Sequence, residues 1–182
     1  MRDKDVSSSN VILNAAFDVF SQNPGASLAD VAKAAGVGRA TLHRHFSGRD
    51  DLMVALTLAA ARELDDAVNH AVADCATYTQ GLEMALHAIL PLAARHMFLA
   101  TEPAAHDPRV AAVYAAQTHD LAHDIDMAKA EGTFDPHVPT EWIVQAYENL
   151  IYAGWTMVTS GDATPKQAAA FAWRTLTQGT RP

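Results

Sequence analysis

Apolar residues recur at helical spacing along almost the whole chain, and prolines and glycines interrupt the pattern. Ile12, Ala16, Val19 and Phe20 fall at positions i, i+4, i+7 and i+8, which form one face of an amphipathic helix. This helix is expected to end at the sequence QNPG (22–25), because Asn, Pro and Gly are strong helix breakers. No segment alternates apolar and polar residues with β-branched enrichment, so the sequence predicts no strand.

Three more helices are predicted before residue 75. Ser27 is suited to cap the second helix, and Gly36 supplies a permissive stop for it. The third helix is short, about residues 38–45, and the fourth covers about residues 48–75. The pattern therefore begins with three short helices followed by a long one.

Beyond Cys75 the helical pattern continues in four blocks. They cover about residues 80–100, 107–131, 139–160 and 165–178, with proline-rich or glycine-rich punctuation between them. Pro91 falls inside the first block, so that helix is expected to be kinked there or to start there. The predicted fold class is all-α.

Composition narrows the class of protein further. The chain has 182 residues, of which 49% are hydrophobic, and this is typical of a globular protein with a substantial core. A single cysteine, Cys75, excludes an internal disulfide framework and suits a reducing compartment. No apolar run approaches the roughly 20 residues of a bilayer span, and the polar start MRDKDVSSSN does not resemble a signal peptide. We therefore expect a soluble, cytoplasmic protein with no membrane partner.

The charge is unevenly distributed along the chain. The formal net charge is −8, yet residues 1–50 carry a balance of +1 and the remainder carries −9. Only the first part is therefore suited to approach a polyanion such as DNA.

The basic residues are concentrated in GVGRATLHRHFSGRDDL (36–52). Leu42 and Phe46, spaced i and i+4, are expected to anchor the third helix on the first helix. The glycines of GVG separate the second and third helices, as in a helix-turn-helix, and small residues near Gly38 would let the third helix approach base edges in a major groove. A solvated basic helix face is the alternative interpretation for a charge run of this kind.

On this hypothesis, the predicted base contacts are Arg39, Ala40 and Thr41, beside the small Gly38. The predicted phosphate contacts are Ser27, His43, Arg44, His45 and Arg49.

Residues from about 9 to 55 resemble the DNA-binding domain of the TetR (tetracycline-repressor-like) transcriptional regulators. The resemblance rests on Val19-Phe20, Ser27, Val31, Gly36-Val37, the run Thr41-Leu42-His43-Arg44-His45-Phe46, and Arg49. Three positions depart from the family pattern: Gly38 replaces a small polar cap, His43 replaces Tyr, and Arg49 replaces Lys. The resemblance implies a flexible arm at 1–8, a helix-turn-helix domain at 9–48 and a helical ligand-binding and dimerisation domain at 49–182. It also implies a homodimer that binds a palindromic operator, most often as a repressor, and is released by a small-molecule effector.

The resemblance also directs attention to two further sets of residues. The candidate pocket residues are Leu86, His87, Leu90, Met97, Tyr114, Gln117, Thr118, His119, Tyr147 and Ile151. The candidate dimer-interface residues, on the last two long helices, are Ile143, Leu150, Trp155, Val158, Phe171 and Leu176. Apolar stripes at these positions could equally close the core of a single subunit.

Other functions are less favoured by the sequence. His119 and His123, one helical turn apart, could bind a metal together, and a helical metal-binding protein or metal-responsive regulator is the alternative function. Only two ligands are fixed by this spacing. Neither a nucleotide-binding loop nor a catalytic motif is present, so we expect no enzyme and no cofactor beyond the effector. A regulator that has lost ligand control is a third possibility.

Overall fold

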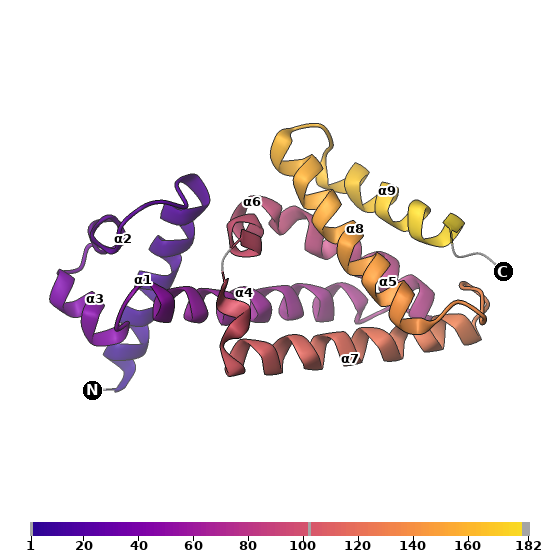
Figure 1. The fold of residues 1–182 in the computed structure, drawn as a ribbon, viewed down its shortest axis with the longest axis horizontal. Helices are drawn as coiled ribbons and strands as arrows, with labels where there is room; N and C mark the ends of the chain where they lie inside the picture. Colours follow the sequence, from indigo (N-terminus) through magenta and orange to yellow (C-terminus); the bar gives the residue numbers. More distant parts are fainter. Residues whose placement is uncertain (1, 102, 180–182) are drawn as a thin grey trace. The chain divides into compact units, whose positions relative to one another are not determined.

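The computed structural model describes residues 2–101 and 103–179, without the side chains of residues 2–7, 100, 101, 103 and 105. The α-helices are α1 (Arg2–Gln22), α2 (Leu28–Ala34), α3 (Arg39–His45), α4 (Arg49–Val72), α5 (Tyr78–Ile89), α6 (Ala93–His96), α7 (Pro108–Ala130), α8 (Thr140–Ser160) and α9 (Pro165–Gly179) (Figure 1). Short 3-10 turns occupy η1 (Leu90–Leu92), η2 (Met97–Thr101) and η3 (Pro103–His106). These elements confirm the all-α prediction. Within the described residues, none of the helices has both the length and the hydropathy needed to cross a bilayer.

The helix boundaries follow the breakers in the sequence. Helix α1 ends at Gln22, immediately before the Asn-Pro-Gly sequence. Pro91 interrupts the predicted 80–100 helix, which the structure divides into α5, η1, α6 and η2. Residues 2–8, which the sequence predicts as part of a flexible arm, are helical in the structure and continue into the rest of α1. Neither proline nor glycine occurs among these residues to stop it.

The chain divides into two compact units, which we describe separately. Unit 1 contains the residues up to Ala61 together with Arg95–Ala111, and unit 2 contains Arg62–Ala94 and the residues from Ala112 onward. Helices α4 and α7 each contribute to both units. The unit that holds the helix-turn-helix is therefore larger than the expected domain of residues 9–48, since it also contains the first half of α4 and a later segment of the chain.

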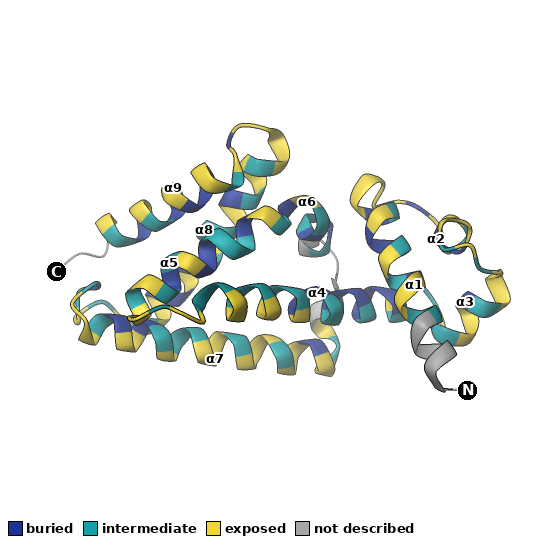
Figure 2. Ribbon diagram, turned by 180° about the vertical axis from the view of Figure 1, so that it is seen from behind, coloured by how far each residue is buried: buried dark blue, intermediate teal, exposed yellow. Residues whose placement is uncertain are grey.

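The hydrophobic core of unit 1 lies between the inner faces of its helices. Phe17 and Phe20 of α1 are at most 2% exposed, and they pack in one cluster with Leu42 of α3, Phe46 and Phe98. Buried positions line the inner sides of α1 and of the start of α4 (Figure 2). Leu42 and Phe46 lie in the same buried cluster as Phe17 and Phe20 of α1, which agrees with the prediction that they hold the third helix against the first.

The core of unit 2 is built mainly from α5, α8 and α9. Helices α8 and α9 lie side by side (Figure 1), and α5 also packs against α9. Tyr147 is buried at the centre of this core, and its hydroxyl donates a hydrogen bond of 2.8 Å to the Leu82 carbonyl. Burial raises the pKa of Tyr147. The Trp155 indole nitrogen donates to the Ile89 carbonyl at 3.1 Å, where α5 gives way to η1.

Candidate nucleic-acid interface

Helix α3 presents one basic face to solvent and one apolar face to the core. Arg39, Ala40, His43 and Arg44 are exposed, whereas Leu42 is 1% exposed. This division follows from the helical period, since the four exposed positions fall on one continuous arc of the helix and Leu42 falls outside that arc. The structure therefore brings four of the predicted DNA contacts onto one accessible surface.

Ser27 lies beside this surface at the start of α2, where it caps the helix. Its hydroxyl and backbone N–H donate to the Asp30 carboxylate at 2.7 and 2.9 Å, and the Asp30 N–H donates back to the hydroxyl at 3.3 Å. These bonds form a capping box. The hydrogen bonds from Ser27 lower the pKa of Asp30.

A hollow on the surface of unit 1 lies between α3 and the start of α2. It has a volume of about 380 Å³ and is lined by Ser27, Leu28, Ala29, Arg39, Leu42 and His43. Three of the predicted DNA contacts, Ser27 from α2 and Arg39 and His43 from α3, thus surround one concave site. An anion placed there would lie near a guanidinium, an imidazole and a hydroxyl, all of which can donate hydrogen bonds to phosphate.

The other three residues predicted at the third helix differ in exposure, since Gly38 is exposed and Thr41 and His45 are less so. Gly38 is the N-cap of α3, in extended conformation, and no side chain there bonds the helix start. Thr41 and His45 are half-buried. Within the described part of the chain, Nε2 of His45 is buried without a hydrogen-bond partner, and the ring lies 6.4 Å from that of Phe46. His45 is therefore less available to a phosphate than His43.

Arg49, which the sequence predicts as a phosphate contact, binds backbone and aromatic groups of unit 1 in the structure. Its guanidinium donates to the carbonyls of Ala26 at 2.9 Å and Pro24 at 2.7 Å, and its Cζ lies 4.5 Å from the centroid of the Phe20 ring. The guanidinium of Arg49 is thus held by groups of unit 1.

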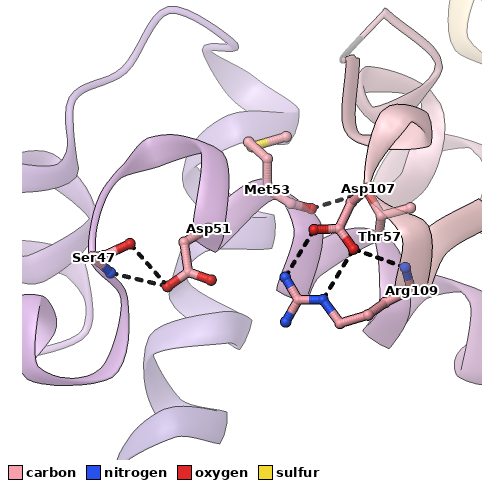
Figure 3. Close-up of polar contacts among 6 residues, drawn as sticks. All are labelled: Ser47, Asp51, Met53, Thr57, Asp107 and Arg109. Atoms are coloured by element: carbon pink, nitrogen blue, oxygen red, sulfur yellow. Dashed lines mark hydrogen bonds and ion pairs between the residues drawn. The ribbon is translucent and has the colours of Figure 1, made fainter.

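Two acidic side chains organise the helix starts around α4 and α7 (Figure 3). The Ser47 N–H and hydroxyl both donate to the Asp51 carboxylate, at 3.0 and 3.3 Å. Asp107, immediately before α7, accepts hydrogen bonds from the backbone N–H and the guanidinium of Arg109, each of 2.9 Å. These bonds lower the pKa of Asp107 and raise that of Arg109, and the nearby Asp51 charge adds to the second shift.

The candidate pocket residues fall into different environments. Leu86, Leu90 and Tyr147 are buried in the core of unit 2, and Ile151 packs against them. Gln117 and Thr118 on α7 donate to Asp65 at 2.8 Å and Glu148 at 3.2 Å, respectively. The others are the half-buried His87 and the exposed Tyr114 and His119. Met97 belongs to unit 1, so the structure does not group it with the other nine residues.

The candidate interface residues are mostly internal to unit 2. Ile143 and Leu176 are 0% and 2% exposed and belong to its core. Leu150, Trp155 and Val158 are half-buried against the same core, whereas Phe171 on α9 is 45% exposed. The exposed aromatic and methionine side chains of α8 are instead Trp142, Tyr152 and Met157.

The two histidines considered for a metal site lie exposed on α7. The His123 ring stands edge-on to Tyr78, with the ring centroids 5.9 Å apart. In residues 2–101 and 103–179, the structure brings together no group of three His, Cys, Asp or Glu side chains that could hold a metal ion.

Sequence reasoning missed the contribution of the segment Arg95–Leu99 to unit 1. Phe98 packs on Phe17 and Phe20 with centroid separations of 6.2 and 6.1 Å, and Leu99 packs against the same cluster. The signal was the run RHMFL between Pro91 and Pro103, but no local pattern indicates which helix such a run will cover.

The fold and the basic face of α3 define a helix-turn-helix DNA-binding protein with a separate helical unit. Residues 12–56 match the family model of the bacterial regulatory proteins of the tetR family. Over 155 residues, the chain is 32% identical to the HTH-type transcriptional repressor LfrR of Mycolicibacterium smegmatis, covering 82% of this chain and 78% of LfrR. The chain belongs to the TetR family.

Solved structures agree with this assignment. The crystal structure of LfrR in complex with proflavine is 26% identical, covers 100% of this chain and 99% of LfrR, and has a TM-score of 0.81. A TetR-family regulator from Marinobacter aquaeolei VT8 shares the fold at 20% identity with a TM-score of 0.75, over 95% of this chain and 97% of its own. The protein is a DNA-binding transcriptional regulator and not an enzyme, and the metal-binding alternative is not favoured.

Proposed function

We propose that this protein is a homodimeric repressor whose two α3 helices enter successive major grooves of a palindromic operator. Arg39, Ala40 and Thr41 contact base edges, with Gly38 permitting close approach of the backbone. The phosphate contacts come from Ser27, His43 and Arg44, with His45 at the margin of the surface. The observation that carries the proposal is the exposed basic face of α3, which meets the α2 N-cap around one hollow.

Anisotropy titrations of a labelled DNA duplex test the operator contacts. The duplex is selected by the wild-type protein from a random library, and a scrambled duplex of equal length is the reference. Arg44→Ala is expected to weaken binding to both and to reduce the slope of log K against log[salt] by about 0.9 per lost phosphate contact. Arg39→Ala is expected to cost about 1–3 kcal/mol on the selected duplex alone.

Lys166→Ala, which removes an exposed charge from α9, is the matched control and should change neither quantity. Selection of no preferred sequence by the wild-type protein, or an unchanged salt slope in Arg44→Ala, would overturn the proposed contacts.

The proposed dimer forms through the outward faces of α8 and α9. Tyr152 and Met157 on α8 and Phe171 on α9 are 49%, 39% and 45% exposed, and exposed apolar side chains that gather on one surface mark interaction sites. Ala153 and Ala170 are also exposed on these helices and would let a second pair of helices approach closely. Ile143 and Leu176 support this surface from within the core.

Sedimentation velocity tests the dimer. Tyr152→Asp and Phe171→Asp place charges on the proposed interface and should convert a dimer to monomers while helicity is retained. Tyr78→Asp introduces the same charge at an exposed aromatic residue of α5 and should leave the dimer intact. A wild-type monomer, or equal effects of all three substitutions, would contradict the proposed interface.

The proposed effector is a planar aromatic cation that binds within unit 2 among the candidate pocket residues. The relative LfrR has been crystallised with proflavine, a compound of this class. Unit 2 of this chain contains thirteen acidic and five basic residues, whereas unit 1 contains eight of each. Asp124 on α7 is half-buried, and its desolvation raises its pKa. An organic cation bound nearby would compensate this desolvated carboxylate.

Effector binding is proposed to act through α4, which is continuous between the two units. A displacement of α4 would alter the spacing of the two α3 helices in the dimer, so that they no longer match the operator. A strong switch requires the effector to discriminate between the two forms by about 5 kcal/mol.

Proflavine is the probe for this step. It should raise the melting temperature of the wild-type protein and release it from the selected duplex. Asp124→Asn should weaken the effect about tenfold, and Asp162→Asn, which alters an exposed carboxylate between α8 and α9, should not. Proflavine binding with no change in operator affinity would refute the switch.

A further inference from the structure

Arg49 is the first residue of α4, and its side chain reaches back to the turn between α1 and α2. One guanidinium nitrogen donates to the Ala26 carbonyl at 2.9 Å and the other to the Pro24 carbonyl at 2.7 Å. The cation also lies over the ring of Phe20, with Cζ 4.5 Å from the centroid, and that ring is fully buried. These directed contacts hold the side chain within unit 1.

The two carbonyls belong to the turn that connects α1 to α2. Asn23 closes part of it, because its side-chain oxygen accepts from the Gly25 N–H at 3.1 Å and its carbonyl accepts from the Ala26 N–H at 3.0 Å. Arg49 adds the bonds to Pro24 and Ala26 from the side of α4. The turn is thus held both by Asn23, which lies within it, and by Arg49, which lies 23 residues beyond Ala26.

The position of this turn matters because Ala26 immediately precedes Ser27. Ser27 is the N-cap of α2 and lines the hollow that also contains Arg39 and His43. A turn that is free to move would carry Ser27 and the start of α2 with it. Arg49 therefore connects the first turn of α4 to the edge of the DNA-binding surface without itself belonging to that surface.

Arginine is specifically suited to this arrangement. Its planar fork donates to two acceptors at once and stacks on an aromatic face, whereas a lysine ammonium offers one point charge on a flexible stem. Lysine would keep the charge at this position and lose the bidentate geometry. Substitution of Arg49 by lysine can therefore distinguish the effect of the bidentate geometry from the effect of the charge.

We propose that Arg49 is a positioning residue for operator binding, which acts by fixing the α1–α2 turn to the start of α4, and that it is not a phosphate contact. The proposal rests on the proposed operator contacts of α3. It predicts that Arg49 affects the preference of the folded protein for its operator, while the number of counterions released on binding does not depend on it.

The test uses the full-length protein, the duplex selected by the wild-type protein, and the scrambled duplex of equal length. Arg49→Lys and Arg49→Gln are titrated at 15 °C over a series of salt concentrations, after circular dichroism has shown that each variant is folded. Both variants are expected to bind the selected duplex at least tenfold more weakly than wild type, to lose less affinity for the scrambled duplex, and to keep the wild-type salt slope. Arg44→Ala is the matched control, and its salt slope should fall.

Two results would overturn the proposal. If Arg49→Lys binds like wild type and Arg49→Gln loses about 0.9 in salt slope per site, Arg49 is a phosphate contact. If the variants melt at lower temperature but the folded proteins keep the wild-type ratio of the two affinities, Arg49 contributes only to stability. Arg49→Lys alone decides the question if Arg49→Gln does not fold, because it retains the charge. The Arg44→Ala result reports separately on the proposed operator contacts of α3. A failure of those contacts can therefore be distinguished from a failure of the positioning role of Arg49.

Discussion

The guanidinium of Arg95 lies over the ring of Phe17, with Cζ 4.1 Å from the ring centroid. Arg95 belongs to α6 and Phe17 to α1, so this contact attaches the segment after α5 to the first helix of the chain. Arg95 also donates to the Asn14 side-chain oxygen at 3.1 Å and lies 3.8 Å from the Asp18 carboxylate. The buried His96 is the next residue, and its ring is 5.8 Å from that of Phe17.

Arg95→Ala is expected to lower the free energy of unfolding of the protein by about 1–2 kcal/mol. The loss combines a cation–π contact with a hydrogen bond from a charged donor, both only partly exposed to water. Urea unfolding followed by circular dichroism measures it. Asp18→Asn should change the free energy of unfolding by less than about 0.5 kcal/mol, since the Asp18 side chain is 74% exposed and its ion pair is long. Equal losses in the two variants would mean that the ion pair, and not the stacking, provides the stability.

Gly154 of α8 packs closely against Leu90. Among the glycines in the described part of unit 2, it is the one where an added side chain would clash with a neighbour. A Cβ added at Gly154 would clash with Cδ1 of Leu90 and would lie 3.4 Å from Cγ of Leu90 and 3.6 Å from Cβ of Ala168. Leu90 is fully buried, so its side chain has little room to move aside, and Pro91 restricts the backbone of the residue that precedes it. Gly154→Ala should therefore destabilise the protein by about 1 kcal/mol, although alanine is the better helix former.

A double-mutant cycle separates these two effects. In a Leu90→Ala background the obstructing side chain is gone, and Gly154→Ala should then stabilise by about 0.5–1 kcal/mol through helix propensity alone. Thermal and urea unfolding of the four proteins measures the coupling. A stabilising effect of Gly154→Ala in the wild-type background would show that Leu90 yields freely, and the close contact would then carry no energetic weight.

Local rules account for the part of the fold that could be predicted from the sequence. The Asn-Pro-Gly stop after α1, the Ser27 cap of α2 and the interruption at Pro91 each depend on residues within one turn of the chain. The burial of Leu42 and Phe46 was likewise predictable, because their i, i+4 spacing fixes a common helix face. Local signals thus located the helices and the exposed face of α3.

Contacts between residues that are far apart in the chain could not be predicted from the sequence. The sequence shows that Arg49 is charged, but not that its guanidinium reaches Pro24 and Ala26. An apolar stripe shows which face of a helix will be covered, but not whether its own subunit or a second copy covers it. For that reason Ile143 and Leu176 were grouped with Phe171, although only Phe171 of these three is exposed.

Gly38 offers a test of helix capping within the DNA-binding surface. It occupies the N-cap of α3 at φ −72° and ψ 151°, a conformation that Ser27 also adopts at the N-cap of α2. An added Cβ would meet nothing within 4 Å. Gly38→Ser should therefore supply the missing cap and stabilise the protein by a few tenths of a kcal/mol, raising the melting temperature by about 1–2 °C.

Gly38→Ala is the matched control, because it adds the same Cβ without a hydroxyl to accept from the helix start. It should not stabilise, since alanine is a poorer N-cap than glycine. If alanine raises the melting temperature as much as serine does, the gain comes from reduced freedom of the unfolded chain and not from capping.

Glu131, the residue that follows α7, binds the backbone at the start of α5. One carboxylate oxygen accepts the Tyr78 N–H at 2.9 Å, and the other accepts the Thr79 N–H at 2.9 Å and the Thr79 hydroxyl at 2.6 Å. These N–H groups are in the first turn of α5, where no intrahelical acceptor is available to them. The hydrogen bonds from Thr79, followed by the one from Tyr78, lower the pKa of Glu131.

A lowered pKa in the folded state makes this contribution to stability dependent on pH. The stabilisation is fully present above the pKa of glutamate in the unfolded chain, about 4.3, and is lost as the pH falls through the lower folded value. Glu131→Gln should therefore melt at a lower temperature than wild type at pH 7, and the gap should close between about pH 4.5 and pH 3. Asp30 and Asp107 also have lowered pKa values, but they are present in both proteins and so do not affect the gap.

Melting temperatures measured by circular dichroism from pH 7 to pH 3 provide the comparison. Asp66→Asn, which neutralises an exposed carboxylate on α4, controls for the change in net charge and should show a small gap at pH 7. A gap between wild type and Glu131→Gln that stays constant down to pH 3 would mean that the amide loses packing or geometry instead of charge-assisted hydrogen bonds. A gap that closes with acidification would establish that the ionised carboxylate caps α5.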